Sequence, residues 1–378
     1  MARYSCFSLM GLTSAPFTRH LPEMAGLFET CLLGCIPRFR MPIVCGQDQF
    51  SKRSHTKRFT PLTIITDMKY LPRALAAVGL YAVIYILAFI VLARSPEFEA
   101  EEVLTSLLIF GVGLSVAAWL VTRGVVPPPE AVSDAKREFG VVLTYLVLFA
   151  ILFLGWGLSW LKATVPPGAL GEAIVVSAKL IVMVVLPAWL FTRLGHSWES
   201  LLGFGKFDAK LVRIFVVMAT LLMGLQYEVG RGAQEVLKLA QPASFIAALA
   251  PLVWAWMTLD AGLTEEFLFR VLLQTRATAL LRSDTAGIVV MALLFGLAHA
   301  PGYVLRGAHT AEGMAVAPNI VVAAAYGVAV VSPIGLMFGV LWARTRNLWL
   351  LALLHGWTDL LPNLAQVLRL WLGGPSEI

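Results

Sequence analysis

The chain has 378 residues, of which 58% are hydrophobic and 14% are charged. A soluble domain is usually about 45–50% apolar and about 25% charged, so this composition excludes an ordinary soluble protein and indicates a polytopic membrane protein. Residues 1–67 hold eight Lys and Arg against four Asp and Glu, so they carry +4 of the formal net charge of +6. The rest of the chain is nearly neutral, and the net charge therefore does not indicate nucleic-acid binding.

Residues 1–67 differ from the rest of the chain, because they are polar and show no helical or strand periodicity. They contain every cysteine of the chain: Cys6, Cys31, Cys35 and Cys45. The membrane part is therefore expected to have no disulfide and no thiolate chemistry. Two interpretations of this leader stay open: a disordered cytoplasmic tail, or an extension in front of a true start at Met68.

After Met68 the apolar runs have the length of about 20 residues that a bilayer-spanning helix needs. We expect nine spans, near residues 72–93, 101–122, 139–161, 174–193, 211–228, 244–263, 286–300, 319–343 and 347–372. The expected fold is thus an all-α transmembrane bundle with about eight to nine spans. Residues 68–240 would supply N-terminal membrane helices, and residues 241–378 a C-terminal core.

Lys and Arg are distributed unequally between the expected loops. One set of alternate loops is rich in them, for example Arg123, Lys136 and Arg137, and later Arg276 and Arg282. The intervening loops hold one or two basic residues each. Because basic loops stay on the cytoplasmic side, we predict that the richer set and Met68 are cytoplasmic. With nine spans the C-terminus would lie outside.

The stretch Thr264–Arg270 places two carboxylates and an arginine within an apolar run. Each charge costs about 2.5–3.5 kcal/mol at the centre of a membrane helix, even on insertion scales. On an α-helix Glu266 and Arg270 are four residues apart and can pair, whereas Glu265 lies about 100° away without that partner. This pattern favours a structural ion pair beside a catalytic base.

Two further helices carry ionisable side chains at membrane depth. His299 follows Phe295 by four residues, and His355 precedes Asp359 by four residues, so each pair shares a helix face. Because charged groups that face lipid are costly, these side chains are expected to meet the glutamates in the bundle interior. Each pair alone has a structural explanation, but their combination indicates a site on the C-terminal helices.

Such a set of groups favours hydrolysis. Glu265 is the candidate general base that takes a proton from water, and His299 would hold or share that water. His355 and Asp359 would then stabilise the oxyanion. Zinc bound by His299, His355 and a carboxylate is the open alternative. The His-Glu-x-x-His zinc motif, the Gly-x-Ser-Gly motif of rhomboid-type sites and the Gly-x-Gly-Asp motif of intramembrane aspartyl proteases are absent.

The blocks that begin at Glu265 (Glu-Glu-x-x-x-Arg), Phe295 (Phe-x-x-x-His) and His355 (His-x-x-x-Asp) resemble, in this order, the motifs of the CPBP family. These are CAAX-processing and bacteriocin-processing intramembrane proteases, also called the type II CAAX endopeptidase or ABI family. The stretch of residues 335–349, ahead of His355, is similar to the Gly-Leu…Gly…Arg-Thr-x-Ser-Leu-Trp stretch of the family. The resemblance covers about residues 245–365.

The resemblance implies an all-helical protease whose site lies inside the membrane and opens to the cytoplasmic side. Glu265 would activate water with the help of His299, and His355 and Asp359 would form the oxyanion site. The supporting residues would be Glu266, Arg270 and Phe295. The family is often labelled a metalloprotease, so zinc on His299, His355 and Asp359 stays open, although a glutamate–water mechanism needs no metal.

Position 359 departs from the resemblance, because the CAAX-processing members have Asn where this chain has Asp359. An amide can donate a hydrogen bond to an oxyanion, whereas an ionised carboxylate cannot. Asp359 would therefore have to be protonated, to orient His355, or to ligate a metal.

The expected function is that of an intramembrane endopeptidase that cleaves a membrane-tethered or lipidated protein or peptide, near its C-terminus. The expected partners are this substrate and the lipid bilayer, with no nucleic acid, and the oligomeric state is open. The alternative is a non-catalytic membrane immunity or scaffold protein of the same family. A transporter is a third, weaker interpretation, because no inverted repeat is evident. Gly335 and Gly339 have a spacing that favours close helix packing, expected within the chain.

Overall fold

The computed structural model describes residues 71–95, 98, 100–129, 132–202, 207–230, 232–306 and 317–372. The leader predicted over residues 1–67 lies outside the described residues. The described ranges consist of helices joined by loops and turns and contain no strand.

The α-helices are, in chain order, α2 (Leu71–Leu92), α3 (Ala100–Thr105), α4 (Ser115–Val121), α5 (Ala135–Leu148), α6 (Leu158–Thr164), α7 (Ala169–Leu180), α8 (Leu186–Thr192), α9 (Trp198–Leu202), α10 (Ala209–Val229), α11 (Gly232–Leu237), α12 (Ala243–Met257), α13 (Thr275–Leu281), α14 (Asp284–Ala298), α15 (Ala300–Arg306), α16 (Ile320–Tyr326), α17 (Ser332–Thr345) and α18 (Leu348–Trp371). Segments of π-helix connect several of them: η2 (Ser106–Leu114), η3 (Phe149–Gly157), η4 (Ile181–Val185), η5 (Thr258–Leu263), η6 (Glu266–Gln274) and η7 (Gly327–Val331).

Eight of the described helices are long and apolar enough to cross a membrane. They are Leu71–Leu92, Val103–Val121, Ala135–Thr164, Ala169–Thr192, Ala209–Glu228, Ala243–Leu281, Asp284–Leu305 and Ile320–Thr345. The expectation of an all-helical, multi-pass membrane protein is confirmed. The ninth expected span is a helix, α18, but it is not among the eight, because His355, Asp359 and Asn363 lower its apolar character.

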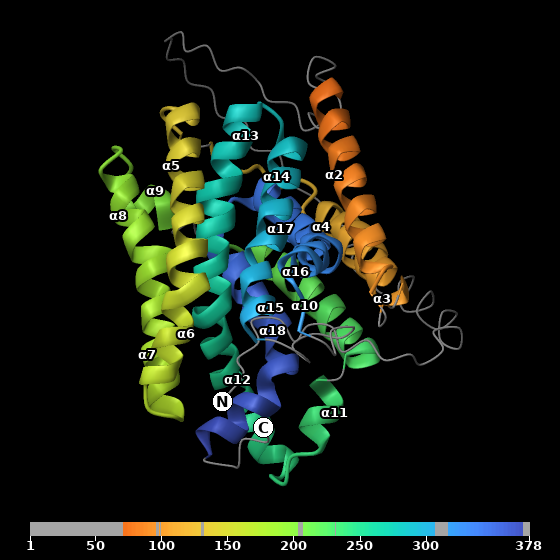
Figure 1. Ribbon diagram of the computed structural model, residues 1–378, viewed down its shortest axis with the longest axis vertical. Coiled ribbons are helices and arrows are strands. Elements are labelled where there is room, and N and C mark those ends of the chain that lie inside the picture. The colour runs from red at the N-terminus through yellow and green to blue at the C-terminus, as the bar shows by residue number, and fades with distance from the viewer. Residues whose placement is uncertain are drawn as a thin grey trace, which may run out of the picture. The chain divides into compact units, whose positions relative to one another are not determined.

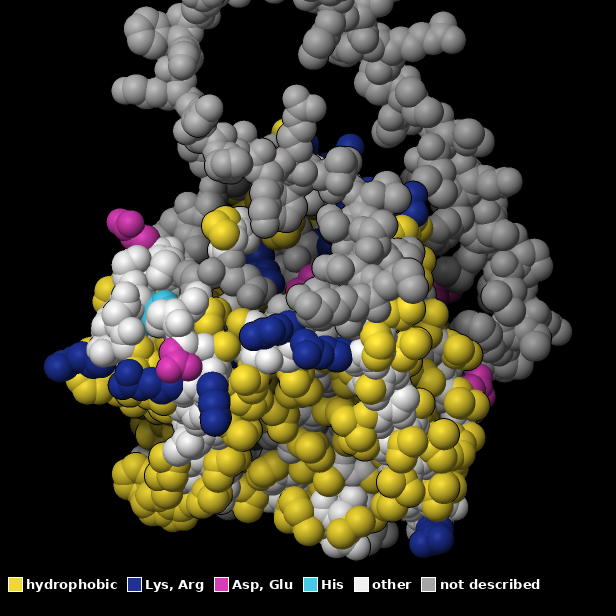
Figure 2. Space-filling view, turned by 90° about the horizontal axis from the view of Figure 1, so that it is seen from above, with side chains coloured by type: hydrophobic (Ala, Val, Ile, Leu, Met, Phe, Trp, Pro, Cys, Tyr) yellow, Lys and Arg dark blue, Asp and Glu magenta, His cyan; other side chains and the backbone are white. Residues whose placement is uncertain are grey.

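The eight candidate spans leave many large apolar side chains on the outside of the protein. Leu108 is 62% exposed, Ile151 62% and Trp156 67%. Hydrophobic side chains cover much of the described surface in Figure 2, with several Lys and Arg side chains gathered near its middle. Apolar surface on this scale is costly in water and is expected where lipid covers it.

The C-terminal helices lie in the middle of the described fold. In Figure 1, α5 to α9 lie on one side of the helix that contains α12 and α13, and α2 to α4 lie on the other side, with α14, α17 and α18 between them. The contacts agree, because α13 packs against α5 while α14 packs against α2 and α17. The helices that carry the expected site are thus shielded by the N-terminal helices.

Glycines allow the closest helix crossings. A Cβ atom at Gly335 would lie 3.1 Å from the Cα atom of Ala292, and one at Gly339 would lie 2.9 Å from Ile288 Cγ2. Both contacts join α17 to α14, so the expected use of this glycine pair within the chain is confirmed. Gly296 and Gly327 make a second contact of this kind, in which a Cβ atom on either one would lie within 2.3 Å of the carbonyl oxygen of the other.

Candidate active site

The two glutamates of the motif lie within one long continuous helix, Ala243–Leu281. Glu265 is 22 residues from the first residue of this helix and 16 from the last, so it lies in the middle part of the candidate span. The π-helical segment η5 ends just before Thr264, and η6 begins at Glu266. Short π-helical segments are often found at functional sites, but η2, η3, η4 and η7 show that they are common in this chain.

Helix α18 crosses this long helix at two glycines. A Cβ atom at Gly262 would lie 2.2 Å from the carbonyl oxygen of Ala352, and one at Gly356 would lie 2.3 Å from Thr258 Oγ1. The two backbones therefore touch on either side of His355, which brings the imidazole to the glutamates. Gly262 and Gly356 are the sequence signal for this close crossing. Neither glycine belongs to the motifs from which the site is predicted.

Side chains from two other helices fix the position of α18. Gln226 of α10 donates a hydrogen bond from Nε2 to the carbonyl oxygen of Thr358 at 2.5 Å. Trp254 of α12 donates from Nε1 to the carbonyl oxygen of Leu353 at 3.0 Å. Because these bonds hold the backbone next to His355 and Asp359, they hold both side chains in place.

Glu266 and Arg270 form the expected ion pair, with 3.0 Å between Oε1 and Nη1, and both side chains are fully buried. The guanidinium carbon of Arg270 lies 4.4 Å from the ring centre of Phe295 and 5.4 Å from that of Phe338. The expected supporting residues Glu266, Arg270 and Phe295 are thus brought together, and Phe338 joins them. The two rings offset part of the cost of burying the guanidinium through cation–π attraction.

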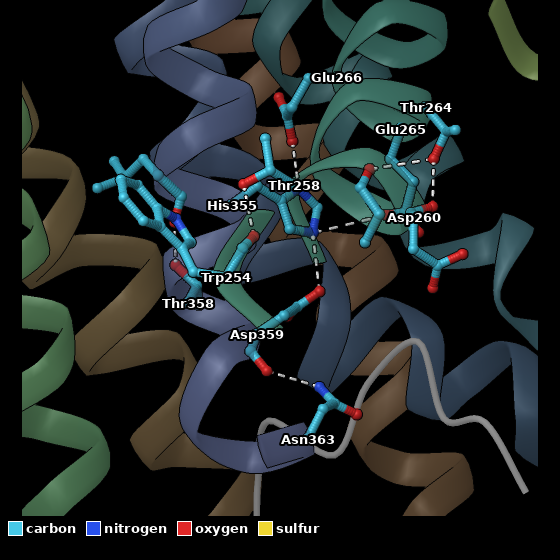
Figure 3. Close-up of polar contacts among 12 residues, drawn as sticks. Trp254, Thr258, Asp260, Thr264, Glu265, Glu266, His355, Thr358, Asp359 and Asn363 are labelled. Carbon is cyan, nitrogen blue, oxygen red and sulfur yellow. Dashed lines mark hydrogen bonds and ion pairs between the residues drawn. The ribbon is translucent and has the colours of Figure 1, made fainter. Parts of the chain in front are cut away.

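Glu266 also contacts His355, which the spacing of the motifs does not predict. Its Oε1 lies 2.6 Å from His355 Nδ1 (Figure 3). A carboxylate that is paired with arginine accepts this hydrogen bond, so Nδ1 carries the proton and Nε2 is the atom that faces the other acidic groups. Phe338 packs against the imidazole, with 5.1 Å between ring centres. Glu266 therefore selects the orientation of His355.

Glu265 and Asp359 both face Nε2 of His355. The distance from Nε2 is 3.8 Å to Glu265 Oε2 and 3.7 Å to Asp359 Oδ2 (Figure 3). These distances are too long for direct hydrogen bonds but allow one oxygen atom to lie within about 2.8 Å of two of these groups at once. Glu265 is 5% exposed, while Asp359 is fully buried. His355 Nε2 thus faces two carboxyl groups, each at a distance that one bridging oxygen atom can span.

His299 lies at the C-terminal end of α14 and is partly buried. Its Nδ1 lies 2.7 Å from the carbonyl oxygen of Phe295, and its ring packs against the Phe295 ring at 4.9 Å. Since a carbonyl oxygen only accepts, Nδ1 carries a proton, and in neutral imidazole Nε2 is then the acceptor. Phe295 thus connects His299 to Arg270, while the role of His299 toward water stays a prediction.

Within the described ranges, buried Lys and Arg side chains form two ion pairs outside the expected site. Lys179 Nζ lies 2.5 Å from Asp260 Oδ1. Glu138 Oε2 lies 3.0 Å from Arg276 Nε. Arg276 was expected in a loop, and this expectation is wrong, because it lies buried in α13. Its ion pair and the ring of Phe191, 4.5 Å from its guanidinium carbon, allow the helix to continue past it.

The zinc alternative requires at least three ligands around one point. Across the described ranges, no group of three or more His, Cys, Asp and Glu side chains is placed to hold a metal ion. His299, His355 and Asp359 are therefore not arranged around one point as metal ligands, and His355 Nδ1 is hydrogen-bonded to Glu266.

A comparison with protein families is decisive for residues 247–361. They match the model described as "Type II CAAX prenyl endopeptidase Rce1-like". These residues are a domain of that family. Neither the search of curated proteins nor the search of solved structures gave a match. The Rce1-like domain begins within α12, contains the rest of the long helix and reaches into α18, so it includes Glu265, His299, His355 and Asp359.

The family domain and the eight candidate spans together give the general class of the protein. It is a multi-pass membrane protein with a CAAX-type endopeptidase domain, and the family suggests intramembrane protease activity. The match ends ten residues before the end of α18 at Trp371 and starts after α2 to α11, which lie outside the domain.

Proposed function

We propose that this protein is an intramembrane endopeptidase that hydrolyses a peptide bond near the C-terminus of a lipidated, membrane-tethered protein. The observation that carries the proposal is the placement of Glu265 Oε2 3.8 Å from His355 Nε2, while Glu266 holds the opposite ring nitrogen at 2.6 Å. A glutamate next to an oriented imidazole, within a domain of a CAAX endopeptidase family, fits the hydrolysis of a peptide.

The glutamate supplies the base in the proposed mechanism. Glu265 takes a proton from a water molecule, whose oxygen attacks the carbonyl carbon of the scissile bond. His299 helps to hold this water through Nε2. The proton on Glu265 then passes to the leaving nitrogen as the carbon–nitrogen bond breaks. The products are a shortened lipidated protein and a released C-terminal peptide.

The imidazole supplies the oxyanion contact. His355 in its protonated form donates from Nε2 to the oxygen of the tetrahedral intermediate, while Nδ1 donates to Glu266. The carboxylate of Asp359, 3.7 Å from Nε2, favours the imidazolium. Asp359 thus acts by orienting and charging His355, which is one of the roles left open for a carboxylate at this position. No step is assigned to a metal.

The test is cleavage of quenched-fluorescent peptides with a farnesylated CAAX-type C-terminus by the full chain in detergent. Glu265→Gln keeps the size of the side chain but removes the base, so we expect at least a hundredfold loss of kcat. Glu199→Gln, at an exposed position of α9, is the matched control and should cleave like the wild type.

Each reaction is also run with and without a chelator. Cleavage that persists with the chelator but is lost in Glu265→Gln supports a glutamate-activated water. Loss with the chelator would return His299, His355 and Asp359 to the role of metal ligands. Unchanged cleavage in folded Glu265→Gln would refute the proposed base, and no cleavage by any variant would favour the non-catalytic immunity or scaffold protein.

A further inference from the structure

The ion pair between Lys179 and Asp260 lies beside the candidate site but has no part in the proposed mechanism. The distance from Lys179 Nζ to Asp260 Oδ1 is 2.5 Å, and the two side chains are 11% and 13% exposed. Helix α7, which carries Lys179, packs against η5, which carries Asp260. Lys179 lies outside the family domain of residues 247–361. The N-terminal helices therefore add a cation next to the glutamate helix.

The π-helical turn brings this ion pair toward Glu265. Five residues separate Asp260 from Glu265, and on an α-helix they would point about 140° apart. A π-helix turns through a smaller angle per residue than an α-helix, and η5 includes Asp260 to Leu263, so the angle between Asp260 and Glu265 is smaller than 140°. Figure 3 shows Asp260 and Glu265 next to each other on the same helix, with Asp359 across from them. The ammonium of Lys179 is held by Asp260, a residue of the same helix as the candidate base and five positions before it.

The proposed substrate has a negative charge at a fixed distance from the scissile bond. A CAAX tail ends three residues after its lipidated cysteine, so an extended chain places the terminal carboxylate about 10 Å from the bond that is cut behind that cysteine. Five residues of helix span about 7.5 Å, and the ammonium of Lys179 lies 2.5 Å from the carboxylate of Asp260. A cation paired with Asp260 is therefore at a suitable distance from Glu265.

The other buried Lys and Arg side chains of the described ranges, Arg270 and Arg276, form ion pairs with glutamates. Arg270 is fully buried between Glu266 and two phenylalanine rings. The side chain of Arg276 is 2% exposed and bonds Glu138 and the carbonyl oxygen of Val271. The side chain of Lys179 is mostly buried but keeps 11% of its surface exposed. An ammonium group has three N–H donors, so it can bridge a carboxylate of the protein and a carboxylate of a ligand.

We propose that Lys179 binds the C-terminal carboxylate of the substrate and makes the enzyme selective for cleavage close to a free chain end. This inference rests on the proposed function, since it assumes that a C-terminal peptide is released. Asp260 holds the ammonium in place before the substrate arrives and shares it afterwards. Lys179 is thus a specificity residue contributed by a helix outside the family domain.

The test compares two farnesylated fluorogenic peptides that differ only at the end, one with a free carboxylate and one with a carboxamide. The quantity measured is the ratio of their kcat/KM values in the full chain. A charge-assisted contact predicts a ratio of about ten to a hundred for the wild type. We expect the ratio to fall to about one in Lys179→Met and to recover in part in Lys179→Arg.

Asp260→Asn separates carboxylate binding from a structural link between α7 and η5. It breaks the ion pair as fully as Lys179→Met does but leaves the ammonium, so the ratio should stay at or above that of the wild type. A loss in Lys179→Met that affects both peptides equally would refute the proposal, and so would a wild-type ratio near one. Failure of the wild type to cleave either peptide would refute the proposed function instead.

Discussion

Gly262→Ala tests whether the close crossing of η5 and α18 builds the site. The added Cβ atom would lie 2.2 Å from the carbonyl oxygen of Ala352, 3.0 Å from its carbonyl carbon and 3.2 Å from its Cα atom. All three are backbone atoms, so no side-chain rotation relieves the contact. Ordinary van der Waals contact begins at about 3.4 Å, so the helices must move apart by about 1 Å.

A displacement of this size has a calculable effect on activity. His355 is three residues from Ala352 on α18, so it moves with that backbone away from Glu265 and Glu266. A misplacement of about 1 Å can lower the rate by about a hundredfold. Overpacking of this kind also destabilises a protein by about 1–3 kcal/mol. We therefore expect a loss of kcat of about a hundredfold and a lower midpoint of thermal inactivation.

The assay is cleavage of the farnesylated peptide by purified variants, with the inactivation midpoint measured on the same samples. Gly224→Ala and Gly140→Ala are matched controls, because a Cβ atom at either glycine meets nothing within 4 Å. Both lie within helices and should keep wild-type activity. Full activity in Gly262→Ala would refute the view that this crossing sets the distance between His355 and the glutamates.

The remaining predictions concern the acidic partners of His355 and Arg270. Glu266→Gln leaves the buried Arg270 without its counter-charge, which should cost about 3–5 kcal/mol of stability. Adding Arg270→Met should restore part of that loss, which a double-mutant cycle of thermal unfolding measures. Strictly additive effects of the two substitutions on stability would contradict an interaction between Glu266 and Arg270. Asp359→Asn should keep kcat within about tenfold of the wild type, because an amide can donate a hydrogen bond to the oxyanion itself and so makes up for the lost charge beside His355. Asp359→Leu should lose far more, and equal losses in both variants would contradict a polar role at this position.

Helix content and candidate site residues were predictable from the sequence because both depend on local patterns. Apolar runs of about 20 residues determine membrane spans without knowledge of their neighbours. The cost of charges in such runs marks Glu265, Glu266 and Arg270 as unusual, and a spacing of four residues predicts the Glu266–Arg270 pair. The family domain found over residues 247–361 agrees with the resemblance expected over about residues 245–365.

The sequence by itself thus determined the class of the protein, eight of its nine expected spans and the ionisable groups that would have to meet. Only the tertiary structure decided how they meet, because contacts between helices depend on where two backbones cross. Gly262 and Gly356 allow α18 to approach so closely that Glu266, rather than Asp359, holds Nδ1 of His355. The π-helical η5 and the packing of α7 likewise place Lys179 and Asp260 beside Glu265, although 81 residues separate the two charges along the chain.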